Sequence, residues 1–536
     1  MTSCTDGTGE TESGMTTGSS STTSNSGCEV GALGCMCTEG GSCDTGLMCS
    51  VGVCVDVALT TSSTTGTAST TDGTSTTEAT STTGDPTSST SGDPGSCDPD
   101  AGLKNPDCPD DMPYCSASGV CGDCSVLVSC ADVSASKAVC DVGSGDCVEC
   151  TVGEDSACGG DTPVCDAFVS ECTGCTDHAQ CPDSACDLET GQCMDPDKLV
   201  HIFSDSENSG NCTNVVGVGG TVDMPYCTIV AARAHADDNG GQNGSTFKII
   251  PGGPLFQSAV TFANFGEPTV IAVVADSNPS TAPEFQSQFP VVEVAGDVTV
   301  YFNNVDIVSG AVLSDHPIVQ CTNGATIDIS NSRLRDGLGP GVRGKNCNLK
   351  LRSSTVTKNK SEGIEFVGGS LVMRNVFITK NGSHVKWGGG GLSLDKVDID
   401  IVYSTIVDNA APNGADSISC TIALGKHLVR NSIIAHNPDN PNPSVACIGL
   451  TIHNSLVDGG EGSGEGNMKR AAEDILDLLE AEGITGIYRI AGADAAAMME
   501  GVASWTEDDP RSDFEGDPRP LEDGSPDSPG ADLFSE

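Results

Sequence analysis

A short phrase recurs seven times between Phe302 and Val457, and this repetition constrains the fold more than any other feature of the chain. Each copy opens on an apolar residue, contains Asn or Ser, and closes on Leu, Ile or Val. The copies are FNNVDI at 302, ISNSRL at 329, LRSSTV at 351, MRNVFI at 373, IVYSTI at 401, VRNSII at 429 and IHNSLV at 452, spaced 22 to 28 residues apart. Such spacing with strand-like alternation is typical of a solenoid, in which each repeat buries its apolar face only by stacking on its neighbours.

Two columns of polar residues run through these repeats. The third position reads Asn304, Asn331, Ser353, Asn375, Tyr403, Asn431 and Asn454, and six positions later come Asn359, Asn381, Asn409 and Asn437. Asn tolerates the left-handed backbone of a tight corner, and stacked amides can hydrogen-bond along a column. The sequence therefore predicts an all-β fold for this half, a parallel β-helix whose crossovers we expect to be right-handed.

The chain is strongly acidic. It has 24 Lys and Arg against 75 Asp and Glu, which gives a formal net charge of −51. A surface of this kind repels polyanions, so we exclude wholesale binding to nucleic acid or anionic lipid. Partners of the whole chain should be neutral, cationic or metal ions.

The 29 cysteines indicate an oxidising compartment and hence an extracellular or outer-membrane surface location. They divide into even sets of 6 at 28–54, 16 at 97–193 and 6 at 212–447, which leaves Cys4 alone. Met1-Thr2-Ser3-Cys4 resembles the end of a bacterial lipoprotein signal, where the Cys is acylated. We expect a lipid on Cys4 to be the only membrane contact, with the true start upstream; the alternative is a stray thiol in a tail.

Composition divides the chain into six segments. Ser/Thr/Gly runs have too little apolar surface to offset the entropy of ordering, so they are predicted to be disordered tethers. The segments are a tether with Cys4 at 1–27, a six-Cys disulfide knot at 28–56, a Ser/Thr-rich linker at 57–96, a Cys-rich repeat array at 97–198, the parallel β-helix at 199–466, and a capping helix with a C-terminal tail at 467–536.

The Cys-rich array has a period near 25 residues and contains the motifs CGDC, CVEC and CTGC. Four thiolates at CxxC spacing could hold zinc, but in an exported chain disulfides are the preferred interpretation, and we assign no metal site. The long linker makes pairing between the knot and the array a distant loop closure, so each set should pair within itself. The many carboxylates of the array are compatible with weak calcium binding; otherwise no cofactor is expected, and no Asp-x-Asp-x-Asp-Gly loop occurs.

The two ends of the β-helix segment carry the phrases that identify a family. VHIFSDSENSGNC, PYCTIVAARAHA and STFKIIPGGPL at the start, and DFEGDPRPLEDGSPDSPGADLF at the end, resemble exported, pectate-lyase-like right-handed β-helix repeat proteins of bacteria. The Cys-rich arrays and tethers are similar to those of surface proteins from predatory soil bacteria. The resemblance covers about 340 residues and implies an opening strand and short helix that cap the solenoid; it is nearly silent on activity. Between the repeats and the tail, KRAAEDILDLLEAEG predicts a capping helix that ends at Gly483.

Basic residues are concentrated at 333–386. The repeat register predicts that Arg352, Arg374 and Arg430 share one outward position and that Lys358, Lys380 and His436 share another. Like charges stacked at coil spacing are stabilised by an anionic ligand, so an anionic polysaccharide or cell-envelope glycan is the expected partner. The competing interpretation is that these side chains pair with the protein's own carboxylates.

Three classes of function remain open: a glycan-binding surface protein, an enzyme, and a structural stalk. Uronate lyases on β-helix folds use a Lys or Arg as base, which makes Lys358 or Lys380, beside Glu362 and Glu365, the candidates for a polysaccharide lyase or glycoside hydrolase. The polygalacturonase signatures are absent as a set. The sequence therefore favours binding without catalysis.

Overall fold

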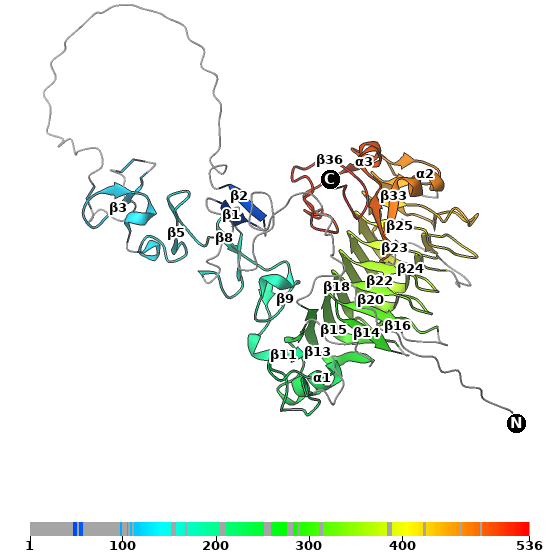
Figure 1. Ribbon diagram of the computed structural model, residues 1–536, viewed down its shortest axis with the longest axis horizontal. Coiled ribbons are helices and arrows are strands. Elements are labelled where there is room, and N and C mark those ends of the chain that lie inside the picture. Colours follow the sequence, from blue (N-terminus) through cyan, green and yellow to red (C-terminus); the bar gives the residue numbers. More distant parts are fainter. Residues whose placement is uncertain are drawn as a thin grey trace, which may run out of the picture. The chain divides into compact units, whose positions relative to one another are not determined.

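Figure 1 shows the computed structural model of the chain, which describes Leu47–Ser50, Val53–Asp56 and, with internal gaps, residues 97–534. The chain forms two compact units, Met1–Thr90 and Ser91–Glu536. In the first unit, β1 (Leu47–Ser50) pairs antiparallel with β2 (Val53–Asp56). Cys4, the predicted tethers and most of the predicted six-Cys knot lie outside the described residues.

The Cys-rich array consists of four repeats of four cysteines, and in each repeat the first bonds to the third and the second to the fourth. The bridges are Cys97–Cys115, Cys108–Cys121, Cys124–Cys140, Cys130–Cys147, Cys150–Cys165, Cys158–Cys172, Cys175–Cys186 and Cys181–Cys193. The prediction that the array pairs within itself is confirmed. Each CxxC motif spans the boundary between two repeats, so its two cysteines belong to different bridges.

Each repeat carries its third and fourth cysteines on a two-stranded antiparallel hairpin, which is too small to form a core without the bridges. The hairpins are β3 (Tyr114–Cys115) with β4 (Cys121–Gly122), β5 (Val139–Asp141) with β6 (Asp146–Val148), β7 (Val164–Asp166) with β8 (Glu171–Thr173), and β9 (Cys186–Asp187) with β10 (Gln192–Cys193). Short 3-10 helices join them: η3 (Cys124–Val126), η4 (Cys130–Asp132), η6 (His178–Gln180) and η7 (Pro196–Lys198).

The predicted parallel β-helix is confirmed. Its described strands form two parallel sheets that stack coil on coil (Figure 1). The larger sheet contains β11 (Leu199–Ile202), β12 (Ser245–Ile249), β13 (Val260–Ala275), β15 (Val292–Asn303), β17 (Val319–Thr322), β18 (Thr326–Ser330), β20 (Val342–Arg352), β22 (Ile364–Arg374), β24 (Leu392–Val402), β26 (Ile418–Cys420), β27 (His427–Arg430), β29 (Val445–Cys447) and β30 (Thr451–His453).

The smaller sheet consists of short strands, most of which follow a left-handed corner residue of the first predicted column. It contains β14 (Glu284–Ser287), β16 (Asp306–Ser309), β19 (Arg333–Arg335), β21 (Thr355–Thr357), β23 (Phe377–Thr379), β25 (Thr405–Val407), β28 (Ile433–Ile434), β31 (Leu456–Val457) and β32 (Met468–Lys469). Inward side chains of both sheets form one long apolar core, represented by Leu349, Leu371 and Ile399 in successive coils. Two further disulfides, Cys321–Cys347 and Cys420–Cys447, join neighbouring coils.

Both predicted columns of corner residues occur, but only one forms an amide ladder. In the buried column, the Asn359 side chain donates to Asn381 Oδ1 over 2.9 Å, and Asn381 donates to Asn409 over 3.0 Å. Asn437 departs from the ladder and donates to Asp408. Every residue of the other column has a left-handed backbone, with φ between 41° and 57°, as a tight corner requires.

A ladder of serine side chains beside the left-handed corner column was not predicted. The Ser432 hydroxyl accepts from Ser404 N over 3.1 Å, and Ser455 accepts from Ser432 N over 3.0 Å. Ser332 and Ser354 form the same bond in earlier coils. These hydroxyls satisfy backbone donors that the corner removes from the sheet ladder.

Helices and hairpins cap the coil stack. The α1 helix (Ile229–Asp238) packs against β11 and β12 at the first coils, and α2 (Ala472–Asp477) packs against β31 at the last, with α3 (Ala493–Met499) in the same C-terminal region (Figure 1). The predicted capping helix is therefore present but stops six residues earlier than expected, because Leu479–Glu482 forms β33 and pairs with β34 (Ile487–Ile490). A last antiparallel pair joins β35 (Ala503–Ser504) and β36 (Pro526–Asp527).

Candidate functional site

The predicted arginine column exists on the outer face of the larger sheet. Arg352 pairs in register with Arg374, and Val402 separates Arg374 from Arg430. Each guanidinium is matched by a carboxylate: Arg352 by Asp328 over 2.7 Å, Arg374 by Asp400 over 2.8 Å, and Arg430 by Asp509. The column is thus a row of ion pairs rather than a row of like charges.

Lysines extend this row. Lys350 lies 3.1 Å from Glu189 of the last Cys-rich repeat, and Lys426 lies 3.1 Å from Asp400. Beside the row of Asp328 and Lys350, on the side away from the arginines, uncharged side chains form a further row, in which Ser370 donates to Asn348 and Asn348 donates to Thr326. We call this surface the Arg–Asp strip and define it by Asp328, Lys350, Arg352, Arg374, Asp400 and Lys426.

The two carboxylates of the strip differ in environment. Burial raises the pKa of Asp328, which is 1% exposed, although Arg352 and Lys350 oppose the shift. At Asp400 burial is the largest single influence and acts to raise the pKa, but hydrogen bonds and charge from Arg374 and Lys426 outweigh it, so the pKa lies below its usual value. Both arginines therefore compensate acids that the sheet has partly removed from water.

The predicted lysine column lies at the C-terminal ends of the short strands of the smaller sheet, whereas the arginine column precedes their N-terminal ends. Lys358 and Lys380 share a left-handed corner position, with φ of 57° at each, and Asp408 occupies the same kind of corner in the next coil. Between this corner and the arginine column, the outer face of β23 is covered by the C-terminal region: Phe377 is fully buried and the Thr379 hydroxyl donates to Gly486 O. The structure therefore does not bring the two basic columns together.

The side chains of the lysine column have local partners. The Lys380 ammonium lies 5.1 Å from the centre of the Tyr488 ring. His436 contacts the Asp458 carboxylate through Nδ1. Lys358 also has an interaction with the rest of the chain.

The predicted catalytic carboxylates are grouped with an arginine. Glu365 accepts from Arg343 over 2.6 Å. Burial raises the pKa of Glu362, and the charges with the largest influence on it are those of Glu365 and Arg343. The basic side chain that contacts Glu365 is Arg343, and the catalytic roles of Lys358, Lys380, Glu362 and Glu365 stay predictions.

The last Cys-rich repeat, 175–193, packs on the same outer face as the Arg–Asp strip. Ala185 and Met194 form an apolar cluster with Ala272, Val274 and Tyr301 of the sheet. The Tyr301 hydroxyl donates to Asp187 over 2.6 Å, and Lys248 donates to Pro182 O over 2.9 Å. These contacts fix the repeat beside the first coils.

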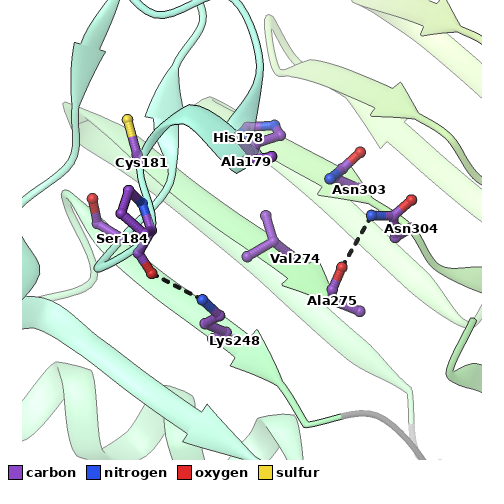
Figure 2. Close-up of a pocket in the computed structure, with 10 residues that line it drawn as sticks. His178, Ala179, Cys181, Ser184, Lys248, Val274, Ala275, Asn303 and Asn304 are labelled. Carbon is purple, nitrogen blue, oxygen red and sulfur yellow. Dashed lines mark hydrogen bonds between the residues drawn. The ribbon is translucent and has the colours of Figure 1, made fainter. Parts of the chain in front are cut away.

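A pocket of about 420 Å³ opens at this junction (Figure 2). Its lining includes His178 and Ser184 from the repeat, and Lys248, Val274, Asn303 and Asn304 from the β-helix. His178 is 5% exposed, its ring packs on that of Tyr301 with centroids 5.5 Å apart, and neither ring nitrogen has a hydrogen-bond partner of good geometry. Burial lowers the pKa of His178 to about 4, so its ring is neutral at physiological pH.

Sequence reasoning missed the acids of the strip and the pocket. Asp328 and Asp400 alternate with inward Ile residues, so the pattern indicates that they face outward but does not indicate their partners. His178 has no sequence signal, because the β-helix residues that complete the pocket are distant in sequence.

In the described part of the chain, the groups of three or more metal-binding side chains close enough to share an ion consist of cysteines that already form disulfides. No helix among the described residues is long and apolar enough to cross a membrane. The eleven disulfides of the described residues indicate an extracellular protein.

Comparison with known proteins gives a match to a family model in the region of the Cys-rich array. Residues 85–199 match the family described as "Family of unknown function (DUF8331)". No curated protein matches the chain.

The solved structures that are similar to the chain include two polysaccharide lyases. One is the crystal structure of pectate lyase Pel9A, with 14% identity and a TM-score of 0.37, covering 62% of this chain and 96% of that one. The other is a rhamnogalacturonan lyase, with 12% identity and a TM-score of 0.28, covering 54% of this chain and 94% of that one. Likenesses this distant carry no conclusion about activity, and the fold rests on the strand pairing described above.

Proposed function

We propose that this chain is an extracellular β-helix protein that binds a glycan along the Arg–Asp strip without cleaving it. The observation that carries the proposal is the row of paired Arg, Lys and Asp side chains on the outer face of successive coils. Arg374 and Lys426, which are 21% and 59% exposed in their side chains, present donors to solvent beside the Asp400 acceptor.

The pairing of charges modifies the ligand that the sequence predicts. A sugar hydroxyl both donates and accepts, so it can bridge the partly exposed Arg374 guanidinium and Asp400 carboxylate, and it can also bind the row of Thr326, Asn348 and Ser370. A polyanion would gain less, because Asp328 and Asp400 already neutralise Arg352 and Arg374. We therefore propose a neutral, hydroxyl-rich polysaccharide in preference to an anionic one.

The arrangement of the acids supports binding over catalysis. Glu362 and Glu365 stand beside Arg343, and Lys380 packs over Tyr488, so the lysine is engaged elsewhere. A lyase needs a base within hydrogen-bond reach of the proton it removes, together with a cation at the substrate carboxylate. In this grouping the Arg343 guanidinium is held by Glu365, and the Lys380 ammonium lies against Tyr488; both engagements support binding over proton abstraction.

A structural surface stalk is the second candidate. The ion pairs between coils favour it, because a row of Arg–Asp contacts can serve the β-helix alone. Attachment through a lipid on Cys4 would suit either function and stays a prediction.

The two candidates are separated by an array of neutral and anionic polysaccharides probed with the full-length, oxidised protein. Binding of a neutral polymer that persists at elevated salt supports the proposal, since screening weakens exposed charge pairs more than hydroxyl contacts. Incubation of each bound polymer with the protein, followed by assays for new reducing ends and for unsaturated products, tests for turnover. If no glycan binds, the structural stalk is the remaining candidate. If products form, the protein is an enzyme.

A further inference from the structure

The pocket beside the last Cys-rich repeat has the character of a built site. Three of its polar side chains, His178, Ser184 and Asn303, are each at least 95% buried. A volume of about 420 Å³ lies within the range of small-molecule pockets. The pocket joins two parts of the chain that disulfides and packing hold in place, so it is largely preformed.

His178 is the side chain that points to a ligand. Burying a polar group without a hydrogen-bond partner is unfavourable, so such a group calls for an explanation. The backbone of Cys186 lies near enough to favour the protonated ring slightly, yet neither nitrogen makes a well-formed hydrogen bond. One nitrogen of the neutral ring donates and the other accepts, and a hydroxyl group can partner either of them.

The rest of the lining fits the same chemistry. Asn303 and Asn304 contribute amides, and Ser184 a hydroxyl, while Val274 provides apolar surface for the C–H face of a ring (Figure 2). The pocket adjoins the Arg–Asp strip, because Asn303 pairs in register with Ser330, which pairs with Arg352, and because the Arg352 charge acts on His178.

We infer that this pocket binds one neutral sugar unit, the terminal unit of the glycan that the Arg–Asp strip holds. The existence of the pocket site stands on its own geometry; only the identity of its ligand as the end of that polymer rests on the proposed function. The repeat at 175–193 thereby prevents the bound polymer from extending past the pocket, so the site selects chain ends.

Saturation-transfer NMR and calorimetry on the full oxidised protein test the inference, with D-glucose, D-galactose, D-mannose and N-acetyl-D-glucosamine as neutral probes and D-galacturonate as the acidic one. Ala179 is exposed on the pocket rim, so Ala179→Trp should block the pocket without unfolding the repeat. Ala131→Trp is the matched control, since Ala131 is exposed at the second position of a 3-10 helix in the second repeat, as Ala179 is in the last, and its N–H also binds the helix-capping side chain.

At least one neutral probe should bind the wild-type protein, and Ala179→Trp should weaken it by about tenfold or more. His178→Phe, which keeps the ring packed on Tyr301 but removes both nitrogens, should weaken it by roughly tenfold, the value of one hydrogen bond. Ala131→Trp should bind like wild type.

Absence of neutral-sugar binding, binding that survives Ala179→Trp, or binding of D-galacturonate alone would overturn the inference. A strip variant, Arg374→Ser with Asp400→Ser, separates it from the proposed function. If the strip fails as a polymer site, this variant has no effect on polymer retention; if the pocket fails, monosaccharides do not bind whatever the strip does.

Discussion

The Tyr301 hydroxyl donates a hydrogen bond of 2.6 Å to the Asp187 carboxylate, and this bond joins the last Cys-rich repeat to the outer face of the β-helix. Burial, with the hydrogen bond to Asp187, raises the pKa of Tyr301 far above its usual value. The phenol therefore stays a donor throughout the neutral range, and the repeat stays docked beside the pocket.

Replacing Tyr301 with Phe should loosen the docked repeat. The loss of one hydrogen bond should cost about 1 kcal/mol, and amides of residues 175–193 should exchange hydrogen severalfold faster. Tyr114→Phe is the control, because the Tyr114 hydroxyl bonds Cys147 N inside the array. Equal exchange in all three proteins would show that the apolar cluster alone holds the repeat.

Removing Arg352 should destabilise the β-helix more than removing an outward residue usually does. Arg352→Ser leaves the Asp328 carboxylate buried without its nearest cation, so we expect a loss of about 1–3 kcal/mol in unfolding free energy. The double variant Arg352→Ser with Asp328→Ser should recover most of the lost unfolding free energy. Arg343→Ser, at a pair whose side chains are 39% and 36% exposed, should cost only about 0–1 kcal/mol. Denaturant unfolding of the four proteins gives the comparison, and equal losses for the two single arginine variants would contradict the burial argument.

The amide ladder should be costly to interrupt. Asn381 accepts from Asn359 and donates to Val356 O and Asn409, all in the buried interior. Asn381→Ala should therefore cost about 2–4 kcal/mol. Asn437→Ala removes a partly exposed bond to Asp408 outside the ladder and should cost about 1 kcal/mol. Thermal unfolding distinguishes the two, and a smaller loss at Asn381 would show that the ladder is not a stabilising element.

Asp532 should make stability depend on pH. Burial, aided by the charges of Asp513 and Glu515, raises its pKa from 3.8 to about 7, and its Oδ1 atom has no hydrogen-bond partner. The folded chain therefore holds a proton that the unfolded chain releases between about pH 4 and 7. The stability this gives is present below about pH 4 and is lost as the pH rises to about 7.

Asp532→Asn should gain about 1–3 kcal/mol relative to wild type across that pH window, and little more above pH 7. Asp508→Asn, at an exposed position of the same C-terminal region, should follow wild type. Melting temperatures measured from pH 4 to 8 give the difference. A constant difference between Asp532→Asn and wild type would mean that Asp532 is ionised throughout.

The repeat register was predictable because it is local. Each phrase specifies which residues face inward and where the chain turns, so the coils, the left-handed corners and the arginine column follow from the sequence. The serine ladder also has a sequence signal, since Ser432 and Ser455 each follow an Asn in the repeated phrase.

The partners of the strip were harder to predict because they come from other coils and from the tail. Asp328 precedes Arg352 by one coil, Asp400 follows Arg374 by one coil, and Asp509 reaches Arg430 from the C-terminal region. The pocket needs the Cys-rich repeat to fold onto the sheet, as the bond from Lys248 to Pro182 shows. No local pattern encodes such docking.

The affinity of a strip variant for the polysaccharide identified on the array decides whether the strip binds a glycan. Arg374→Ser with Asp400→Ser removes the ion pairs of Asp400 with Arg374 and Lys426 without changing the net charge of the side chains replaced, and Arg343→Ser with Glu365→Ser removes one ion pair outside the strip in the same charge-neutral way. We predict that the first variant loses tenfold or more in affinity while the second binds like wild type, and that neither wild type nor variant yields cleavage products. Equal affinity of the two variants, or products from the wild-type protein, would contradict a glycan-binding strip without catalysis.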